Sequence, residues 1–315
     1  MIRNHFFIAW RNILKSRGYS TLNIVGLAIG MAVTLLIAIW AVNEYSYDRF
    51  LPGYGQLYHV KVNFTSQQNG TTKQDGISLP LADVLRKDIP GIKRVAEADE
   101  IGNEAHDLIV GDKKLYLNGG AAGSAFWQMF AFPFVKGDPV TAFREPFSIV
   151  IDESTAKALF GNRDPMNHAI KIDNDKMVKV TGVIKDIPAN SSLRFSFLMP
   201  FAFKEQTEGW VKDGRTRWTY NSFQIFVELE PGVSVAQLAP KIKDLVVQHS
   251  PEMRPGKPEI WLQPYKDWHL YSDYKNGKVA GGFIDYVHLF TMIGLLVLII
   301  IADGEIRCYT GYPHT

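Results

Sequence analysis

The chain has 315 residues, of which 34 are Lys or Arg and 32 are Asp or Glu, and its formal net charge is +2. This near balance argues against nucleic acid as a partner, and the length allows one large domain or two moderate ones. The single cysteine, Cys308, excludes an internal disulfide framework and a multi-cysteine metal site.

Residues 1–17 predict a basic amphipathic helix. Apolar residues recur at helical spacing on one face, and basic residues lie on the other. The apolar face contains Ile2, Phe6, Trp10, Ile13 and Leu14, and the basic face contains Arg3, Arg11 and Lys15. Such a helix lies in the membrane interface, in contact with lipid headgroups. A short basic N-terminus with accidental periodicity is the alternative.

Residues 18–43 predict a transmembrane helix. These 26 residues contain no charged side chain. As a helix they would extend about 39 Å, which exceeds a hydrocarbon core of about 30 Å. A cleaved signal peptide is the alternative, but its apolar region is shorter and ends in a small-x-small site. Basic residues without any acidic one precede the span and predict a cytoplasmic N-terminus.

Small residues recur every four positions within this span. They are Gly26, Gly30, Thr34 and Ala38. On a helix this spacing forms a ridge that lets a second membrane helix approach closely. Because glycine is frequent in membrane helices in general, the pattern favours a packing role without requiring one.

Residues 44–280 have the composition of a water-soluble α+β domain. Alternation predicts a half-buried strand at 58–64, with His59, Lys61 and Asn63 on the polar face. Residues 78–89 predict a helix that begins at the N-cap Ser78 and ends before Pro90.

The second half of the domain repeats the pattern. Residues 147–161 predict a strand and then a short helix, opened by Asp152 and Glu153 and ended by Gly161. Further strands are predicted at 177–188, 223–229 and 258–265. Ser234 and Gln237 predict a capping box that starts one more helix. The order indicates a βαβ-type outer lobe with a strand-rich lobe inserted into it.

A second apolar run covers 17 residues, from Tyr286 to Ala302, and predicts a second transmembrane helix within 281–302. His288 lies near its outer end and Asp285 just outside it. A buried core helix of a soluble domain is the alternative. Two spans would return the chain to the cytoplasm and leave the domain outside it.

No sequence motif for catalysis, cofactor binding or metal binding is present. The chain has no Walker A, G-x-S-x-G or H-E-x-x-H pattern, and its eight histidines are scattered. The glycine-rich segment 118–123 predicts a turn between strands rather than a phosphate-binding loop. Residues 266–275 group Asp267, His269 and Asp273 with aromatic residues that are typical of a membrane interface. We therefore predict a protein that is not an enzyme.

Four segments resemble the MacB-like, or FtsX-like, family of ABC-transporter permeases. They are residues 9–32, 78–98, the pair 149–172 and 178–195, and 283–301. The third is the most specific, because its strand is followed by a helix similar to the family's S-x-x-x-A-x-x-x-F-G pattern. Ser154, Ala158, Phe160 and Gly161 match that pattern approximately.

The resemblance implies a permease subunit in the cell inner membrane, with its N-terminus in the cytoplasm and its two-lobed core domain in the periplasm. It implies a separate cytoplasmic ABC ATPase that drives efflux or release of a peptide, drug or lipoprotein. It also implies a dimer of permease units and a periplasmic accessory protein. No cofactor is expected. A membrane-anchored sensor or binding module is the alternative, and an extracytoplasmic enzyme is a more distant one.

The segment 303–315 has no cap, no periodicity and no counterpart in the family. The family continues after the second span with a helix that docks the ATPase and with two further spans. We therefore expect a truncated or frame-shifted permease whose native sequence stops near Ile301. A naturally short protein with two spans and a tail is the alternative.

Overall fold

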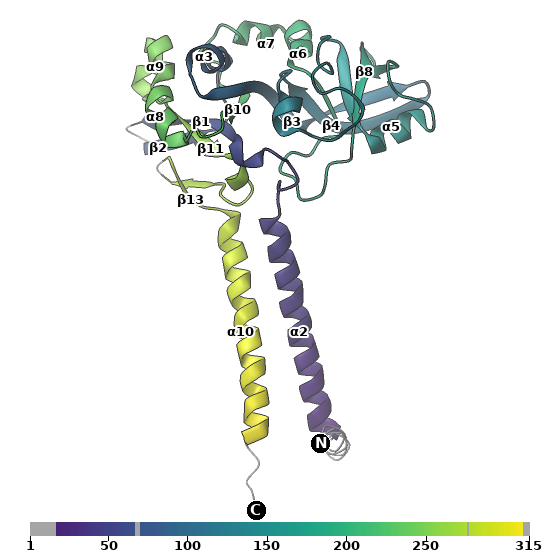
Figure 1. The fold of residues 1–315 in the computed structure, drawn as a ribbon, viewed down its shortest axis with the longest axis vertical. Coiled ribbons are helices and arrows are strands. Elements are labelled where there is room, and N and C mark those ends of the chain that lie inside the picture. The colour runs from purple at the N-terminus through teal and green to yellow at the C-terminus, as the bar shows by residue number, and fades with distance from the viewer. Residues whose placement is uncertain (1–16, 67–69, 276, 311–315) are drawn as a thin grey trace, which may run out of the picture. The chain divides into compact units, whose positions relative to one another are not determined.

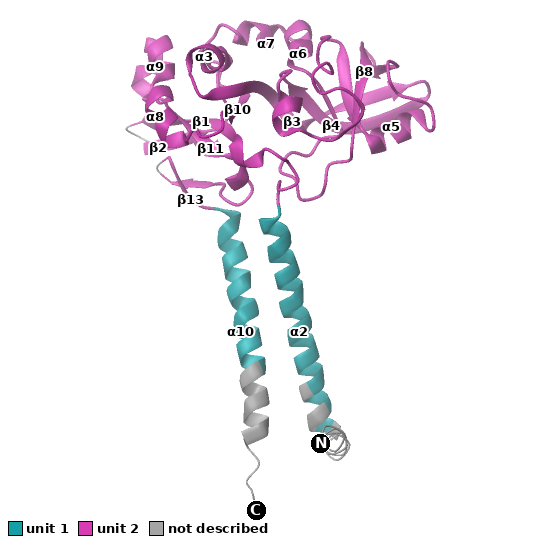
Figure 2. Ribbon diagram, in the orientation of Figure 1, with its two compact units in different colours: residues 1–46, 282–315 teal, residues 47–281 magenta. Residues whose placement is uncertain are grey.

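The computed structural model describes residues 17–66, 70–275 and 277–310 (Figure 1). The chain divides into two compact units (Figure 2). The first, which we call the helical unit, comprises residues 1–46 and 282–315, and the second, which we call the domain, comprises residues 47–281. The predicted interfacial helix, with Arg3, Phe6, Trp10, Arg11 and Lys15, lies outside the described residues.

The helical unit consists of α2 (Arg17–Tyr45) and α10 (Phe283–Thr310). Ile24–Tyr45 and Phe283–Ile301 are long and apolar enough to cross a membrane. The two predicted apolar helices are therefore confirmed as helices. α10 continues beyond Ile301 through residues in which the sequence shows no helical pattern. Extending a helix that has already formed adds one hydrogen bond for each residue that is fixed, so it needs no periodicity of its own.

The domain is built on one mixed sheet of eleven strands. Nine of them follow the order β11-β1-β10-β3-β4-β9-β6-β8-β5, while β2 pairs with β1, and β7 pairs with β3 and β8. The strands are β1 (Leu57–Ser66), β2 (Gly70–Gln74), β3 (Ile92–Val110), β4 (Lys113–Ala122), β5 (Phe134–Gly137), β6 (Ser148–Asp152), β7 (Ala169–Ile172), β8 (Lys176–Ile184), β9 (Phe197–Pro200), β10 (Gln224–Leu229) and β11 (Glu259–Pro264). A separate hairpin joins β12 (Asp273–Lys275) to β13 (Lys278–Gly281).

Helices cover this sheet in two groups, which define the two lobes. Figure 1 shows α8 and α9 at one end of the domain and α5 at the other. The helices are α3 (Pro80–Asp88), α4 (Phe126–Phe130), α5 (Glu153–Phe160), α6 (Phe201–Thr207), α7 (Gly209–Gly214), α8 (Val235–Ile242) and α9 (Leu245–His249), with 3-10 turns η1 (Tyr54–Gln56), η2 (Pro251–Gly256) and η3 (Tyr265–Asp267).

Each lobe has its own apolar core, and a third core joins them. Leu85, Ile225 and Leu238 belong to the core of the outer lobe, and Leu159 belongs to that of the inserted lobe. The joining core is rich in aromatic residues from α4, including Trp127. The predicted α+β fold with an inserted lobe is confirmed, and the 19-residue strand β3 runs through both lobes.

Most local signals are confirmed. Asp152 caps α5 by accepting a hydrogen bond from the Thr155 N–H at 2.7 Å, and Gly161 follows the last residue of that helix. Ser234 and Gln237 form the predicted capping box of α8. α8 ends at Ile242, and a separate short helix, α9, follows it.

Three local predictions are wrong. α3 begins at Pro80, so Ser78 is not its N-cap, and the Ser78 hydroxyl is buried without a hydrogen-bond partner among the described residues. β1 is buried on both faces rather than one, because His59 and Lys61 are 0% and 1% exposed. Segment 118–123 is not a turn, since most of it belongs to β4; a Cβ on Gly119 would lie 2.3 Å from the Phe197 ring, so glycine permits close packing there.

Candidate functional site

The chain enters the domain at a buried carboxylate, Asp48, three residues after the end of α2. Asp48 is 1% exposed and has a φ of 60°, a left-handed conformation that is uncommon for residues other than glycine. The Ser192 N–H and hydroxyl donate to its two oxygens at 2.8 and 2.5 Å. The hydroxyls of Ser191 and Tyr265 donate to Oδ1 at 3.3 and 3.4 Å. We call these contacts the Asp48 cluster.

The Asp48 cluster joins three segments that are distant in sequence. They are the entry segment after α2, the loop around residue 192 between β8 and β9, and η3. The Asp48 N–H also donates to the Asn190 carbonyl at 2.9 Å, so backbone and side chain hold the same loop. Burial raises the pKa of the Asp48 carboxyl, although the hydrogen bonds from Ser192 oppose that shift.

Tyr265 connects this cluster to the aromatic core between the lobes. Its ring centroid lies 5.2 Å from that of Phe130 and 5.3 Å from that of Trp268, in edge-on arrangements that aromatic pairs prefer. Burial and the Asp48 charge hold the pKa of the Tyr265 hydroxyl well above its usual value. A displacement of Asp48 would therefore disturb the packing of Tyr265 in the core that joins the lobes.

A buried ion network crosses the sheet on β3. The Lys204 ammonium on α6 lies 2.6 Å from the Asp99 carboxylate and 2.6 Å from that of Glu104. His106 lies 3.2 Å from Glu104 and 2.5 Å from Asp173, in the turn between β7 and β8. Burial lowers the pKa of Lys204, but the two carboxylates outweigh it and the net shift is upward. The interaction with Glu104 raises the pKa of His106.

A second network fixes the same face of β3 closer to the outer lobe. Glu97 accepts hydrogen bonds from Arg86 on α3 at 2.8 Å and from Arg215, which follows α7, at 3.1 Å. Arg215 also donates to Glu205 on α6 at 2.6 Å. Because Glu97, Asp99 and Glu104 all pair with cations, helices from both lobes are tied to one strand.

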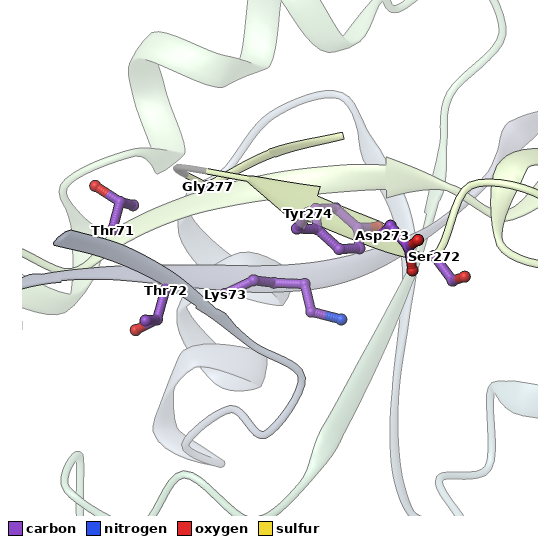
Figure 3. Close-up of a pocket in the computed structure, with 7 residues that line it drawn as sticks. All are labelled: Thr71, Thr72, Lys73, Ser272, Asp273, Tyr274 and Gly277. Carbon is purple, nitrogen blue, oxygen red and sulfur yellow. The ribbon is translucent and has the colours of Figure 1, made fainter. Parts of the chain in front are cut away.

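β2 and the β12–β13 hairpin are joined by a third charged group, of which Figure 3 shows Lys73 beside Tyr274. The ammonium groups of Lys61 and Lys73 lie 2.5 and 2.8 Å from Asp75, and Lys73 lies 4.4 Å from the centroid of the Tyr274 ring. Burial lowers the pKa of Lys61 to about 8. Burial also raises the pKa of Asp75, but the two lysines outweigh it and lower that pKa to about 2.

Figure 3 shows the open pocket beside this group, lined by residues of both segments. Asp273, noted in the sequence, lies there, while His269 stacks on Tyr47 with ring centroids 3.4 Å apart. Thr71 bonds to Thr65 at 2.9 Å, and Lys73 is held by Asp75. These partners make the pocket wall a junction between two hairpins rather than a set of groups free for a ligand.

In the helical unit, part of the small-residue ridge contacts α10. A Cβ on Gly30 would lie 2.3 Å from Ile301 Cδ1. The Thr34 hydroxyl donates to the Gly30 carbonyl at 2.9 Å and lies 3.5 Å from the Gly294 carbonyl. Gly26 has no atom within 4 Å of its Cβ position, and Ala38 is exposed. A packing role for the whole ridge stays a prediction.

Sequence reasoning missed Asp48, Lys61 and Lys204. None stands in a motif, since each owes its environment to residues more than ten positions away. A weak signal existed for Lys61, because a lysine in an alternating strand can be buried when a second layer covers the polar face. Among the described residues, no group of three His, Cys, Asp or Glu could hold a metal ion.

The fold is similar to that of a solved protein domain. A domain assigned to a permease protein of Porphyromonas gingivalis has a TM-score of 0.58 and 22% identity, covering 68% of this chain and 91% of that one. The periplasmic region of MacB from Actinobacillus actinomycetemcomitans has a TM-score of 0.46 and 15% identity, covering 66% and 90%. The extracellular domain of the ABC-type transporter YknZ from Gram-positive bacteria has a TM-score of 0.46 and 14% identity, covering 65% and 99%.

Comparison with protein-family models identifies the family of the chain. No curated protein matches it. The model of the MacB-like periplasmic core domain matches residues 20–245, which is more than half of the chain and includes most of α2 together with the sheet as far as β10. The chain therefore belongs to the family of the MacB-like periplasmic core domain.

Proposed function

We propose that the chain is the permease subunit of an ABC transporter, in which a separate cytoplasmic ATPase drives conformational work outside the cytoplasm. The observation that carries this proposal is the matched core domain between two helices that are apolar enough to span a membrane. The work would be efflux or release of a peptide, drug or lipoprotein. A dimer of permease units, contacts with membrane lipid and a periplasmic accessory protein belong to the same proposal.

The connections between helices and domain support mechanical coupling. α2 ends at Tyr45, and Asp48 is already held in the core by four hydrogen-bond contacts of its side chain. At the other end, β13 ends at Gly281 and α10 begins at Phe283. Both connections are only a few residues long, and in this proposal a shift of a helix is passed to the domain through them.

Inside the domain, the ion networks on β3 would carry such a shift between the lobes. Lys204 and Arg215 hold α6 and the segment after α7 against a strand that runs through both lobes. Buried charges that lose their partners are costly, which keeps these contacts together as the domain moves. In this proposal the residues transmit force and position, and ATP is hydrolysed by the separate subunit.

Co-purification tests the proposal. The gene is tagged at its chromosomal locus within the exposed turn Gly111–Asp112 between β3 and β4, and the protein is purified from native membranes in mild detergent. We expect an ATPase with an ATP-binding cassette to co-purify. We also expect ATP to change the protease sensitivity of the domain. When the Walker A lysine of the ATPase is replaced, ATP should leave the protease sensitivity unchanged. Recovery of a signalling partner without an ATPase would instead support a membrane-anchored sensor.

A further inference from the structure

A second pocket lies where the two lobes meet. Most of its polar side chains make no hydrogen bond or ion pair among the described residues, unlike those beside the pocket in Figure 3. It has a volume of about 500 Å³, within the range of ligand pockets. Its polar lining comes from both lobes and comprises Asn103, Asn118, Ser192, Arg194 and Gln224, beside the half-buried ring of Trp268.

Four of these side chains face solvent, since Asn103, Asn118 and Arg194 are exposed and Gln224 is half-buried. Within residues 17–66, 70–275 and 277–310, the side chains of Asn103, Asn118, Arg194 and Gln224 make neither a hydrogen bond nor an ion pair. This contrasts with the ion networks on β3, where every carboxylate named above has a cation. Polar groups from three strands and one loop thus surround a single hollow, where a polar ligand can take the place of the water bound to them.

The pocket lies at a break in the β3–β4 ladder. Asp99 pairs with Ala121 and Glu104 with Gly119, so residues 100–103 face Gly120 alone. Irregular pairing of this kind re-aims side chains and often accompanies functional sites. The backbone is close-packed in the pocket wall at Gly102, which has a φ of 81°. A Cβ added to Gly102 would lie 2.2 Å from the Arg194 carbonyl oxygen.

The lining selects among ligand chemistries. Arg194 contributes a guanidinium, and no Asp or Glu lines the pocket, so the lining favours an anionic group. Each Asn or Gln amide offers one acceptor and two donors, which complements the N–H and C=O of a peptide main chain. Phosphate at neutral pH carries only one or two O–H donors and would leave amide oxygens of the lining unmatched. A neutral sugar would leave the guanidinium without an anion.

We propose that this pocket binds the carboxylate-bearing end of a short, extended peptide. Arg194 pairs with the terminal carboxylate, the amides of Asn103, Asn118 and Gln224 bond to the peptide main chain, and Trp268 contacts a side chain. Ser192 and Trp268 place the pocket next to the Asp48 cluster, since Ser192 bonds to Asp48 and Trp268 packs on Tyr265. Ligand binding would thus affect Asp48, three residues after the end of α2.

The test uses the full chain in lipid nanodiscs, without any ATPase, so its result is independent of the proposed permease role. The probe is a random tetrapeptide library in which half of the molecules end in a free carboxylate and half in an amide. Peptides retained with the nanodiscs are quantified by mass spectrometry. We expect free acids to be retained about threefold more than amides, the ratio that an ion pair at an exposed arginine provides.

Two matched variants decide the outcome. Arg194→Gln should reduce the preference for free acids to about one, whereas Arg163→Gln, an exposed arginine outside the pocket, should preserve it. Because the exposed Arg194 side chain has no partner among the described residues, its variant should unfold at the wild-type denaturant concentration. Equal retention of acids and amides, no retention, or a preference that survives Arg194→Gln would overturn the proposal. Preferred retention of chitobiose or inorganic phosphate would overturn the peptide assignment.

Discussion

Asp48 and Ser192 stand 144 residues apart in the sequence, yet the backbone N–H and the hydroxyl of Ser192 both donate to the two oxygens of the Asp48 carboxylate. One residue belongs to the segment that leaves α2 and the other to a loop of the inserted lobe. The contact makes the entry of the chain part of the inserted lobe as well as of the outer lobe. A functional account of the domain therefore begins at this pair.

Replacing Asp48 should destabilise the domain in a graded way. Asp48→Ala leaves the Ser192 N–H and the Tyr265 hydroxyl buried without an acceptor, and it also places a Cβ-bearing residue without polar groups in a left-handed conformation. We expect a loss of about 2–4 kcal/mol in the free energy of unfolding. Asp48→Asn keeps one acceptor oxygen and suits the left-handed region, so its loss should be smaller.

Urea unfolding followed by near-ultraviolet circular dichroism measures both variants. Asp112→Ala, in the exposed turn between β3 and β4, is the control and should unfold like the wild type. Equal losses for Asp48→Ala and Asp112→Ala would show that the Asp48 cluster does not stabilise the domain.

Lys61 should make the domain more stable in mild alkali. The pKa of Lys61 is about 8 in the folded domain and 10.5 in its ordinary range. Between these values the unfolded chain binds a proton that the folded domain has lost, so stability rises with pH across that window. The gap corresponds to a contribution on the order of 3 kcal/mol at most.

The measurement is the difference in unfolding free energy between wild type and Lys61→Met at pH 7.5, 8.5 and 9.5. Because other groups titrate in both proteins, only the difference reports on Lys61. We expect the wild type to gain on the variant as the pH rises. A difference that is independent of pH would mean that Lys61 titrates as an exposed lysine does.

Lys204→Met should be among the most damaging single substitutions in the domain. It leaves Asp99, which is 3% exposed, without its cation and leaves Glu104 with His106 alone. Removing one partner of a buried ion pair costs about 3–5 kcal/mol. The control is Lys212→Met, at an exposed position without an ion pair among the described residues. Adding Asp99→Asn to Lys204→Met should recover part of the loss, and a further loss would contradict a charge effect.

Local patterns allowed much of the fold to be predicted from the sequence. The apolar runs predicted both long helices, and the capping box at Ser234 and Gln237 is present as expected. Alternation located β1 but assigned His59 and Lys61 to a solvated face, because a one-dimensional pattern does not reveal that a second layer covers that face.

The candidate sites could not be predicted from the sequence for a related reason. Asp48, Ser192 and Tyr265 meet through tertiary contacts between segments that carry no shared motif. The pocket between the lobes depends on a register break in β3 that no periodicity signals. Sequence patterns report on the neighbours of a residue along the chain, whereas these sites are made by neighbours in space.

The proposed topology can be tested with the single native cysteine. In the wild type, Cys308 follows the second apolar run and should react with a membrane-impermeant maleimide only after the cells are permeabilised. In a Cys308→Ser background, Asp112→Cys lies in an exposed turn of the domain and should react once the outer membrane alone is opened. The reverse pattern of labelling would place the domain in the cytoplasm and exclude the proposed orientation.

Packing of α2 on α10 should depend on Gly30 far more than on Gly26. A side chain at Gly30 meets Ile301 and Val297, whereas one at Gly26 meets nothing within 4 Å. Trp40 lies 5.4 Å from the Phe290 ring, so a cysteine pair placed beside these residues reports on contact between the helices. We expect Gly30→Leu to reduce disulfide formation between Ile37→Cys and Gly294→Cys several-fold, since close approach at small residues permits this packing. Gly26→Leu should leave that disulfide intact.

If Gly26→Leu weakens association between copies of the chain, the exposed part of the ridge contacts another helix, as the four-residue spacing predicts. If Gly30→Leu has no effect on the disulfide, the pairing of the two helices does not rest on this glycine.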